Sequence, residues 1–306
     1  MTAMMSAAIA FSRYGQPDVL APSKLEVPPP GPGQVRIQVR AVSVNPIDVK
    51  IRSGMMDGII PVCFPVVPGW DVAGVVQEAG PGAAAAAGDE VFGVASVGGY
   101  SEYALLGRPV AKPAGLSWAA AAALVTVGEA AFRVLKHLNL SAGQTLLILG
   151  AGGSVGTIAT QLAVARGLTV VGTASPDDAG RLAALGATAV GYGEGWADRV
   201  RTAAPGGVDA VFDTTGAGLL AGAVSLAGDP ARVITIADPG AAEHQVRFTG
   251  ADPADRAPEA LPELARLMAA GQLTVPVWRS YPLAEAATAH ADLEAGRNHG
   301  KIVLLP

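Results

Sequence analysis

Three glycines at positions 150, 153 and 156 constrain the fold of this chain more than any other feature. The first of them ends an apolar run, TLLILG, and the other two lie in a stretch of small residues with helical character, GGSVGTIATQLAVARG. Glycine lacks Cβ, so it permits a sharp turn, close approach of the backbone to a ligand, and tight packing of a helix on a strand. The order predicts a βα unit whose helix N-terminus offers N–H groups to a phosphate. An ordinary tight βα turn is the alternative, because the spacing is not G-x-G-x-x-G.

Apolar runs alternate with helical stretches on the C-terminal side of this turn. The runs are LTVVGTA, TAVGY, VDAVFDTTG and RVITIA. Short buried strands that alternate with helices predict a parallel, doubly wound sheet. A helix is also expected from Ser117, a suitable N-cap, and an amphipathic helix over residues 258–273.

The first 110 residues have a different character. QVRIQVRAVSV at 34–44 alternates apolar and polar residues, and clusters of Pro and Gly interrupt the segments around it. This pattern is typical of half-buried strands joined by turns. We expect residues 1–15 to hold the first strand and KIVLLP at the C-terminus to rejoin this β-rich region. The fold class is therefore α/β, with a β-rich domain and a doubly wound domain.

The composition disfavours several kinds of partner. The formal net charge is −5 and no block of Lys or Arg occurs, which argues against nucleic acid and anionic membranes. The single cysteine, Cys63, permits neither an internal disulfide nor a cysteine-rich metal cage. No run of about 18 apolar residues is free of interruptions, and no basic leader precedes the first apolar segment. We expect a cytoplasmic protein without a transmembrane helix.

Several phrases in one order resemble the medium-chain dehydrogenase/reductase superfamily, and most closely its zinc-independent quinone oxidoreductase branch, which includes zeta-crystallin. They are NPIDVKIRSG (45–54), FPVVPGWDVAGVV (64–76), GGYSEYALL (98–106), the glycine turn, VFDTTG (211–216) and HGKIVL (299–304). The resemblance implies a GroES-like catalytic domain from residues 1–120 and 266–306, with a Rossmann domain, 121–265, inserted. It also implies a cofactor in the cleft between them, and commonly a homodimer.

The residues that hold zinc in alcohol dehydrogenases of that superfamily are replaced in this chain. Those enzymes place a cysteine near the position of Asn45, and a Gly-His-Glu where this chain has Gly69-Trp70-Asp71. The four histidines, at 137, 244, 290 and 299, show no ligand spacing and are expected at the surface or in the core. We expect no metal site.

The absence of the zinc ligands narrows the reactions that we expect. Interconversion of a ketone and an alcohol needs a Lewis acid or a proton donor on the oxygen, and no lysine lies four residues after a tyrosine. Adding hydride to a quinone or an enone gives a delocalised anion, which hydrogen-bond donors can stabilise. We therefore expect a reductase of quinones or α,β-unsaturated carbonyls. The alternatives are an enoyl reductase of secondary metabolism and a redox sensor that binds NADPH without turnover.

The second strand of this βαβ unit, which is the first strand after the glycine turn, bears on the choice of coenzyme. It ends in Thr173-Ala174-Ser175, and not in the acid that binds the ribose of NAD. Hydroxyl groups with Arg181 downstream better suit a 2′-phosphate, so Thr173, Ser175 and Arg181 are candidate NADP(H) contacts. The alternative for Arg181 is a solvated helix residue.

Two candidates for catalysis, Asn45 and Lys50, follow the strand expected at 34–44. Asn45 is expected to face substrate and, by resemblance, to lie near the nicotinamide, or else to be a turn residue bonded to local backbone. Lys50 stands where some members carry a tyrosine, and is a candidate to orient a carbonyl or donate a proton, or a solvated lysine. We expect Asp48 to anchor this loop, with Arg52 as a partner.

The resemblance implies further cofactor contacts. They are the glycine turn with Gly150, Gly153, Ser154, Val155 and Gly156 for the pyrophosphate, Tyr192 for the adenosine end, Ile236 for the nicotinamide ribose, and Asn298 or Lys301 near the C-terminus. Relatives carry a threonine where this chain has Glu129, so Thr126, one helical turn earlier, is expected to replace it. Glu129 itself is either an acid/base candidate or an exposed helix residue.

Overall fold

The computed structural model describes residues 3–250 and 252–306 of the chain. It forms two compact units, Met1–Thr126 with Leu261–Pro306, and Val127–Ala260. These boundaries fall inside two helices, α2 (Trp118–Leu138) and α7 (Ala260–Ala269). The boundaries expected from the sequence, after residues 120 and 265, fall inside the same helices.

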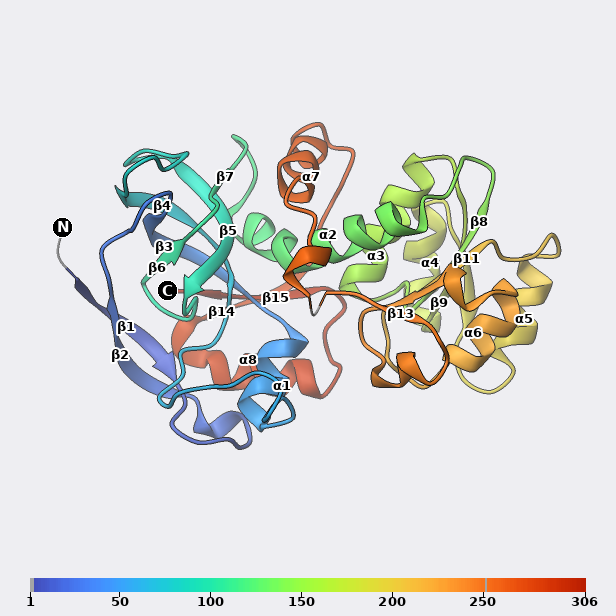
Figure 1. Cartoon of the computed structure of the whole chain (residues 1–306), viewed down its shortest axis with the longest axis horizontal. Coiled ribbons are helices and arrows are strands. Elements are labelled where there is room, and N and C mark those ends of the chain that lie inside the picture. The colour runs from blue at the N-terminus through green and yellow to red at the C-terminus, as the bar shows by residue number, and fades with distance from the viewer. Residues whose placement is uncertain (1–2, 251) are drawn as a thin grey trace. The chain divides into compact units, whose positions relative to one another are not determined.

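The second unit is built on a parallel six-stranded sheet (Figure 1). Its strands are β8 (Thr145–Leu149), β9 (Thr169–Ala174), β10 (Thr188–Gly191), β11 (Ala210–Asp213), β12 (Val233–Thr235) and β13 (Arg247–Phe248). The strands lie in the order β10-β9-β8-β11-β12-β13, and every neighbouring pair is parallel. This is the 3-2-1-4-5-6 order of dinucleotide-binding folds, which confirms the doubly wound sheet.

Helices connect these strands in turn. They are α3 (Ser154–Ala165), α4 (Pro176–Ala184), α5 (Trp196–Ala203) and α6 (Leu220–Ala227), with the 3-10 turns η2 (Pro230–Arg232), η3 (Pro239–Ala242) and η4 (Pro253–Asp255). Leu147 and Leu149 of β8 and Val171 and Val211 of its two neighbours are fully buried in one cluster. The central strands read as continuous apolar runs because such strands are covered on both faces.

The first unit consists mainly of antiparallel strands, in two sheets. The strands are β1 (Met4–Ala10), β2 (Ala21–Val27), β3 (Val35–Val44), β4 (Asp71–Ala79), β5 (Glu90–Val97), β6 (Tyr103–Leu106), β7 (Val110–Ala111), β14 (Val277–Pro282) and β15 (Lys301–Leu305). β3, β4, β5 and β6 close a cycle, because β6 pairs with both β5 and β3. β15 pairs antiparallel with β3, so the C-terminal strand rejoins the β-rich region as predicted. This unit also holds η1 (Pro17–Val19), α1 (Pro46–Ser53), η5 (Leu283–Glu285) and α8 (Ala286–Glu294).

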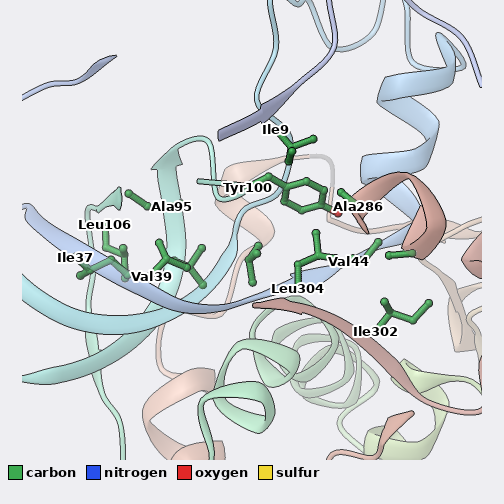
Figure 2. Packing of buried hydrophobic residues seen from close by; sticks show 14 of the residues in the cluster. Ile9, Ile37, Val39, Val44, Ala95, Tyr100, Leu106, Ala286, Ile302 and Leu304 are labelled. Carbon is green, nitrogen blue, oxygen red and sulfur yellow. The ribbon is translucent and has the colours of Figure 1, made fainter. Parts of the chain in front are cut away.

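One hydrophobic cluster unites the N-terminal and C-terminal parts of this unit. Figure 2 shows the ring of Tyr100 among aliphatic side chains that include Val44 of β3, Leu304 of β15 and Ala286 of α8. Tyr100 is fully buried. The packing therefore holds α8 and β15 on the strand that carries Val44.

Helix α1 corrects the sequence analysis, which treated residues 45–54 as a loop. Pro46 occupies its first position, and the carboxylate of Asp48 accepts the backbone N–H of Asn45 at 2.8 Å. Asn-Pro-x-Asp is a helix start signal, because proline suits the first helical position and an acid at the third bonds back to the cap. Asp48 thus anchors this segment, as expected, but by capping the N-terminus of a helix rather than by holding a loop.

Helix α2 begins where the sequence predicted. The hydroxyl of Ser117 accepts the N–H of Ala120 at 3.1 Å, which confirms the N-cap. In the described part of the chain, α2 is the one helix long and apolar enough to cross a membrane, and 67% of its most apolar window is buried. Such burial is typical of a core helix in a folded domain.

Candidate active site and coenzyme-binding turn

Strand pairing in the first unit gathers three polar residues that are far apart in the sequence. Asn45 follows β3, Asp71 begins β4 and Lys301 begins β15. β3 lies between β4 and β15, with Ser43 opposite Asp71 and Val44 opposite Ile302. The register therefore places all three residues at the same end of β3.

The three side chains form one buried hydrogen-bonded cluster. Asn45 Nδ2 donates to Asp71 Oδ2 at 2.8 Å, and Lys301 Nζ donates to Asn45 Oδ1 at 2.6 Å and to the carbonyl of Val44 at 3.0 Å. Thr126 donates to Asp71 through its hydroxyl at 2.7 Å and its backbone N–H at 3.1 Å. The lysine and the carboxylate together fix the orientation of the Asn45 amide.

Burial dominates the electrostatics of this cluster. It raises the pKa of Asp71, while Lys301 and hydrogen bonds from Thr126 and Asn45 act in the opposite sense. It lowers the pKa of Lys301, against the attraction of Asp71 and Asp48. Two carboxyl groups thus lie near one ammonium group, away from water, and their protonation states depend on one another.

The carboxyl group of Asp48 is also strongly shifted. Burial raises its pKa to about 7, and Asp71 adds to the shift. The backbone amides of Asn45 and Gly69, and the charge of Lys301, lower the pKa, each by less than burial raises it. Asp48 therefore changes its charge near neutral pH, a property that a sequence-based assignment to structure alone had not anticipated.

The structure shows where the other predicted residues of this region lie. Lys50 is half-buried on α1, and its ammonium group has no ion pair with any residue that the structure describes. The expected pairing of Asp48 with Arg52 is wrong, because the guanidinium of Arg52 pairs with Glu294 of α8. The catalytic roles of Asn45 and Lys50 stay predictions.

A tyrosine–histidine pair lies in the same core and was not predicted. The hydroxyl of Tyr100 and Nε2 of His290 are 2.9 Å apart, and both side chains are fully buried. Burial and the charge of Arg52 lower the pKa of His290 to about 3, so the ring is neutral at physiological pH. The two residues are 190 positions apart, so no local pattern could have indicated the pair.

In the second unit, the geometry of the glycine turn explains two of its glycines. Gly150 has φ +81°, and a Cβ there would lie 2.6 Å from Oγ1 of Thr214. A Cβ on Gly156 would lie 2.3 Å from the carbonyl oxygen of Gly150. These two positions require glycine for the turn itself and for the packing of α3 on it.

Gly153 differs, because a Cβ there would need only a shift of the backbone by a few tenths of an ångström. It is the N-cap of α3 with φ −72°, and a Cβ there would meet nothing closer than the carbonyl oxygen of Gly150 at 3.3 Å. The next amides, those of Ser154, Val155 and Gly156, lie in the first helical turn, where no intrahelical carbonyl accepts them. The turn thus offers backbone donors around a position where a side chain would only obstruct a ligand.

The turn also lies where such sheets bind nucleotides. β8 has β9 on one side and β11 on the other, so the strand order reverses between β8 and β11. Ligands of open α/β sheets bind at this point, beyond the carboxyl ends of the strands. Thr214, directly after β11, donates its hydroxyl to the carbonyl of Leu149 at 2.8 Å and so ties the two strand ends together. The residues present fit the diphosphate of a dinucleotide.

The hydroxyl residues after β9 support this turn. Thr173 Oγ1 accepts the N–H of Gly150 at 2.9 Å and is buried. Ser175 is the N-cap of α4, where it accepts the N–H of Asp178 and donates to its carboxylate at 2.8 Å. Both hydroxyl groups therefore have structural roles, and their contact with a coenzyme stays a prediction.

Arg181 is held at the glycine turn rather than solvated. Its guanidinium donates to the carbonyl of Gly152 at 2.6 Å and to the hydroxyl of Thr157 at 2.6 Å. It also forms an ion pair with Asp178 at 2.7 Å. A positive charge thus lies beside the turn, partly neutralised by a carboxylate.

The remaining predicted coenzyme residues lie in places that do not decide their roles. Tyr192 follows β10 and is 63% exposed, and Ile236 follows β12 and is half-buried. Asn298 donates to the carbonyl of Gly300 at 2.9 Å, in the turn before β15. Lys301 donates to Asn45, and Thr126 donates to Asp71, both within the first unit. The contact of either residue with a coenzyme stays a prediction.

Glu129 is a structural anchor rather than an exposed residue. Its carboxylate accepts from Arg133 at 2.9 Å, from Arg256 at 3.2 Å and from the backbone of Ala257 at 3.0 Å. Arg133 in turn donates to Thr249 at 2.7 Å. This network fastens the segment after β13 to α2.

Within residues 3–250 and 252–306, no group of three or more His, Cys, Asp or Glu side chains is placed to hold a metal ion. The prediction that the reaction proceeds without zinc is a separate matter and stays a prediction.

Comparison with known proteins agrees with this architecture. Residues 31–136 match the family model of the alcohol dehydrogenase GroES-like domain, and residues 185–304 match that of the zinc-binding dehydrogenases. A quinone oxidoreductase of Rattus norvegicus is 32% identical, over 97% of this chain and 97% of its own. The 2-methylene-furan-3-one reductase of Solanum lycopersicum is 32% identical, over 97% of this chain and 78% of its own.

Among solved structures, the chain is similar to the quinone oxidoreductase of Escherichia coli, which was crystallised with NADPH. The TM-score is 0.88 with 26% identity, and the match covers 98% of this chain and all of the other. Relatives and structure thus match both units together.

Proposed function

Because this chain belongs to the quinone oxidoreductase, or zeta-crystallin-like, branch of the medium-chain dehydrogenase/reductase superfamily, we propose that it reduces quinones or α,β-unsaturated carbonyls with NADPH and without zinc. That it is an oxidoreductase of a nicotinamide-dependent family follows from the membership itself. The acceptor, the choice of NADPH and the independence from zinc are the proposal.

The observation that carries the proposal is the glycine turn at the reversal of strand order. The first-turn amides of Ser154, Val155 and Gly156 would hold the diphosphate, and the absence of a Cβ at Gly153 leaves room for it. A reduced nicotinamide supplies a hydride when bound. The chain itself then has to position an acceptor and stabilise the charge that forms on it.

Two relatives favour a conjugated acceptor. The rat protein is named for a quinone, and the tomato protein for an enone, 2-methylene-furan-3-one. Both acceptors conjugate a carbonyl with a carbon–carbon double bond, so the anion formed by hydride addition is delocalised onto oxygen. An enoyl reductase of secondary metabolism would share this chemistry and is the alternative substrate class.

The preference for NADPH rests on the charge beside the glycine turn. Arg181 supplies a cation near the end of β9, where a 2′-phosphate would lie, and the similar Escherichia coli structure contains NADPH. Asp178 offsets part of that charge, so the preference for NADPH over NADH should be modest. Replacing Arg181 by alanine should lower kcat/KM about tenfold with NADPH and leave the value for NADH within twofold.

The test is the oxidation of NADPH and NADH, followed at 340 nm, with 1,4-benzoquinone, 9,10-phenanthrenequinone and a panel of small enones. Acceptor-dependent oxidation by protein that contains no zinc on elemental analysis supports the proposal. NADPH binding without any acceptor-dependent rate would instead favour the redox sensor, and stoichiometric zinc would overturn the metal-free chemistry. A cytoplasmic location and a homodimer complete the proposal, and cell fractionation and light scattering test them.

A further inference from the structure

A cavity of about 260 Å³ lies within the first unit, beside the Asn45 cluster. Its walls are mostly apolar and include Ile51 of α1, Ile60, Val62 and Val67 of the following segment, and Trp70. Trp70 directly precedes Asp71 of the buried cluster. A cavity of this size with apolar and aromatic walls suits a small ring system.

Only two of the residues that line this cavity are ionisable, Asp48 and Cys63. Asp48 is 1% exposed. Its Oδ2 accepts the N–H of Asn45 at 2.8 Å. Its buried Oδ1 makes no hydrogen bond of normal geometry to a described residue, although the amide of Gly69, in the same cavity wall, lies close enough to lower the pKa of the carboxyl. A buried carboxyl oxygen without a partner is costly, and a ligand in the cavity would supply the missing bond.

Burial favours the protonated form of Asp48 near neutral pH, and the charges around it act in opposite directions. Asp71 repels a second negative charge, while Lys301 attracts one but is already bonded to Asn45 and Val44. Tyr100 lies near enough to feel the charge of Asp48, and its phenol is neutral because burial raises its pKa well above the usual value. Arg52, one turn further along α1, directs its guanidinium to Glu294.

We propose that this cavity binds the carbonyl end of a conjugated acceptor and that Asp48 Oδ1 donates the proton that its oxygen takes up, an inference that rests on the proposed reductase function. Asp48 is then a catalytic residue. Asn45, which bonds its carboxyl group, and Asp71 and Lys301, whose charges act on its pKa, are positioning residues.

The step balances as follows. Reduced nicotinamide would supply the hydride for a new C–H bond on the conjugated system, so that the displaced π electrons would end on the carbonyl oxygen. The O–H bond of Asp48 breaks as an O–H bond forms on that oxygen, which gives an enol from an enone and a hydroquinone or its tautomer from a quinone. The carboxylate of Asp48 regains a proton from water once the product has left.

The first experiment compares pH profiles of the wild type and Asp48→Asn. The amide keeps an acceptor for the N–H of Asn45 but cannot release a proton. With saturating NADPH, kcat/KM of the wild type should fall about tenfold per pH unit above pH 7. In Asp48→Asn, kcat/KM should be about a hundredfold lower at pH 6 and should lack that break. Asp89→Asn, which changes an exposed carboxylate outside the cavity lining, should retain the wild-type profile.

The second experiment does not depend on turnover. Cys63 is the only cysteine of the chain, is exposed and lines the cavity, so its alkylation by iodoacetamide reports occupancy. Acetophenone has a ring and a carbonyl but no alkene to which a thiol can add. At each pH its dissociation constant is taken from the protection of Cys63 relative to unprotected protein. Protection by acetophenone should weaken about tenfold from pH 6 to pH 8 in the wild type and stay constant in Asp48→Asn.

A third variant separates occupancy of the cavity from folding. Ile60→Trp fills the cavity without changing Asp48, and should abolish protection while NADPH still binds. Protection that survives in Ile60→Trp, or a pH break that survives in Asp48→Asn, overturns the role of this site. Absence of reduction by the wild type with pH-dependent protection intact would count against the reductase function alone.

Discussion

At the scale of single residues, the glycine turn separates two positions that the fold needs from one, Gly153, that the proposed diphosphate site needs. Gly156→Ala would place a Cβ 2.3 Å from a backbone oxygen that cannot move aside, so we expect a loss of about 2 kcal/mol in unfolding free energy. Gly153→Ala would meet nothing closer than 3.3 Å, so its melting temperature should stay within a few degrees of the wild type. Its affinity for NADPH should fall at least tenfold, because the methyl group occupies the diphosphate position.

Thermal unfolding and fluorescence titration with NADPH measure the two effects. Gly180→Ala is the matched control. Gly180 lies in α4, a Cβ there would meet nothing within 4 Å, and alanine favours a helix interior. It should bind NADPH like the wild type and be slightly more stable. Unchanged affinity in Gly153→Ala would show that the diphosphate does not bind at this turn.

The residue scale is also where inference from sequence was weakest. Asn45 and Lys301 were both singled out, but as separate coenzyme contacts, whereas the structure bonds them to each other. The two residues are 256 positions apart, and their contact depends on the pairing of β3 with β15. The oxygen of Asp48 that faces no partner depends in the same way on packing by residues 60–70. Nothing in the local sequence encodes such tertiary contacts.

At the scale of elements, local sequence signals such as apolar periodicity and helix caps are sufficient to place helices and strands. Apolar runs that alternate with helical stretches predicted the parallel sheet, and Ser117 predicted the start of α2. The Asn-Pro-x-Asp signal of α1 was present in the sequence but was interpreted as a loop. Physical rules of helix capping would have recovered it.

Glu129 supports a prediction about how elements are joined. Glu129→Ala leaves Arg133, with only 3% of its side chain exposed, without its ion-pair partner, and removes the acceptor for Arg256 and Ala257. We expect a loss of about 3 kcal/mol, because breaking a buried ion pair leaves a charge without compensation. If the residue is only an anchor, kcat should stay within twofold of the wild type at temperatures where the variant is folded.

Urea unfolding and initial rates decide this prediction. Glu263→Ala, which breaks an exposed pair with Arg266 on α7, is the control and should change neither stability nor rate measurably. A hundredfold fall in kcat with unchanged stability would return Glu129 to the acid/base role that its position in the sequence first allowed.

At the scale of the whole molecule, the order of the sequence phrases was enough to predict a β-rich unit from both termini and a doubly wound unit between them. That division into two units is what the family resemblance implied. Strand periodicity and turn composition, which are local properties, indicated the β-rich region, the parallel sheet and the return of the C-terminal strand. The closure of β3, β4, β5 and β6 into a cycle was not predicted, because it depends on β6 pairing with two strands at once. Fold class is thus recoverable from periodicity, whereas the shape of a cavity is not.

Two buried groups of the first unit make opposite contributions to the pH dependence of stability. Asp48 has a folded-state pKa of about 7 against 3.8 when unfolded, so it contributes stability that is present below pH 3.8 and lost as the pH rises to 7. His290 has a pKa of about 3 against 6.5, so its contribution is present above pH 6.5 and lost as the pH falls toward 3. Between pH 4 and 6.5 the folded protein holds one extra proton on Asp48 and lacks one on His290. The two slopes, each about 1.4 kcal/mol per pH unit, therefore cancel.

Single substitutions should expose each slope. Asp48→Asn removes the first, so its unfolding free energy should fall, relative to the wild type, as the pH is lowered from 6.5 to 4.5. His290→Gln keeps a hydrogen-bonding partner for Tyr100 but removes the second, so its unfolding free energy should fall as the pH is raised over the same range. The two curves should diverge from the wild type in opposite directions, at about 1.4 kcal/mol per pH unit each. Urea denaturation at pH 4.5, 5.5 and 6.5 measures them, with Asp89→Asn as the exposed control. An Asp48→Asn curve parallel to that of the wild type would mean that Asp48 is already ionised in the folded protein, and the neutral carboxyl on which its proton donation depends would not exist. A parallel His290→Gln curve would mean that burial does not lower the pKa of His290.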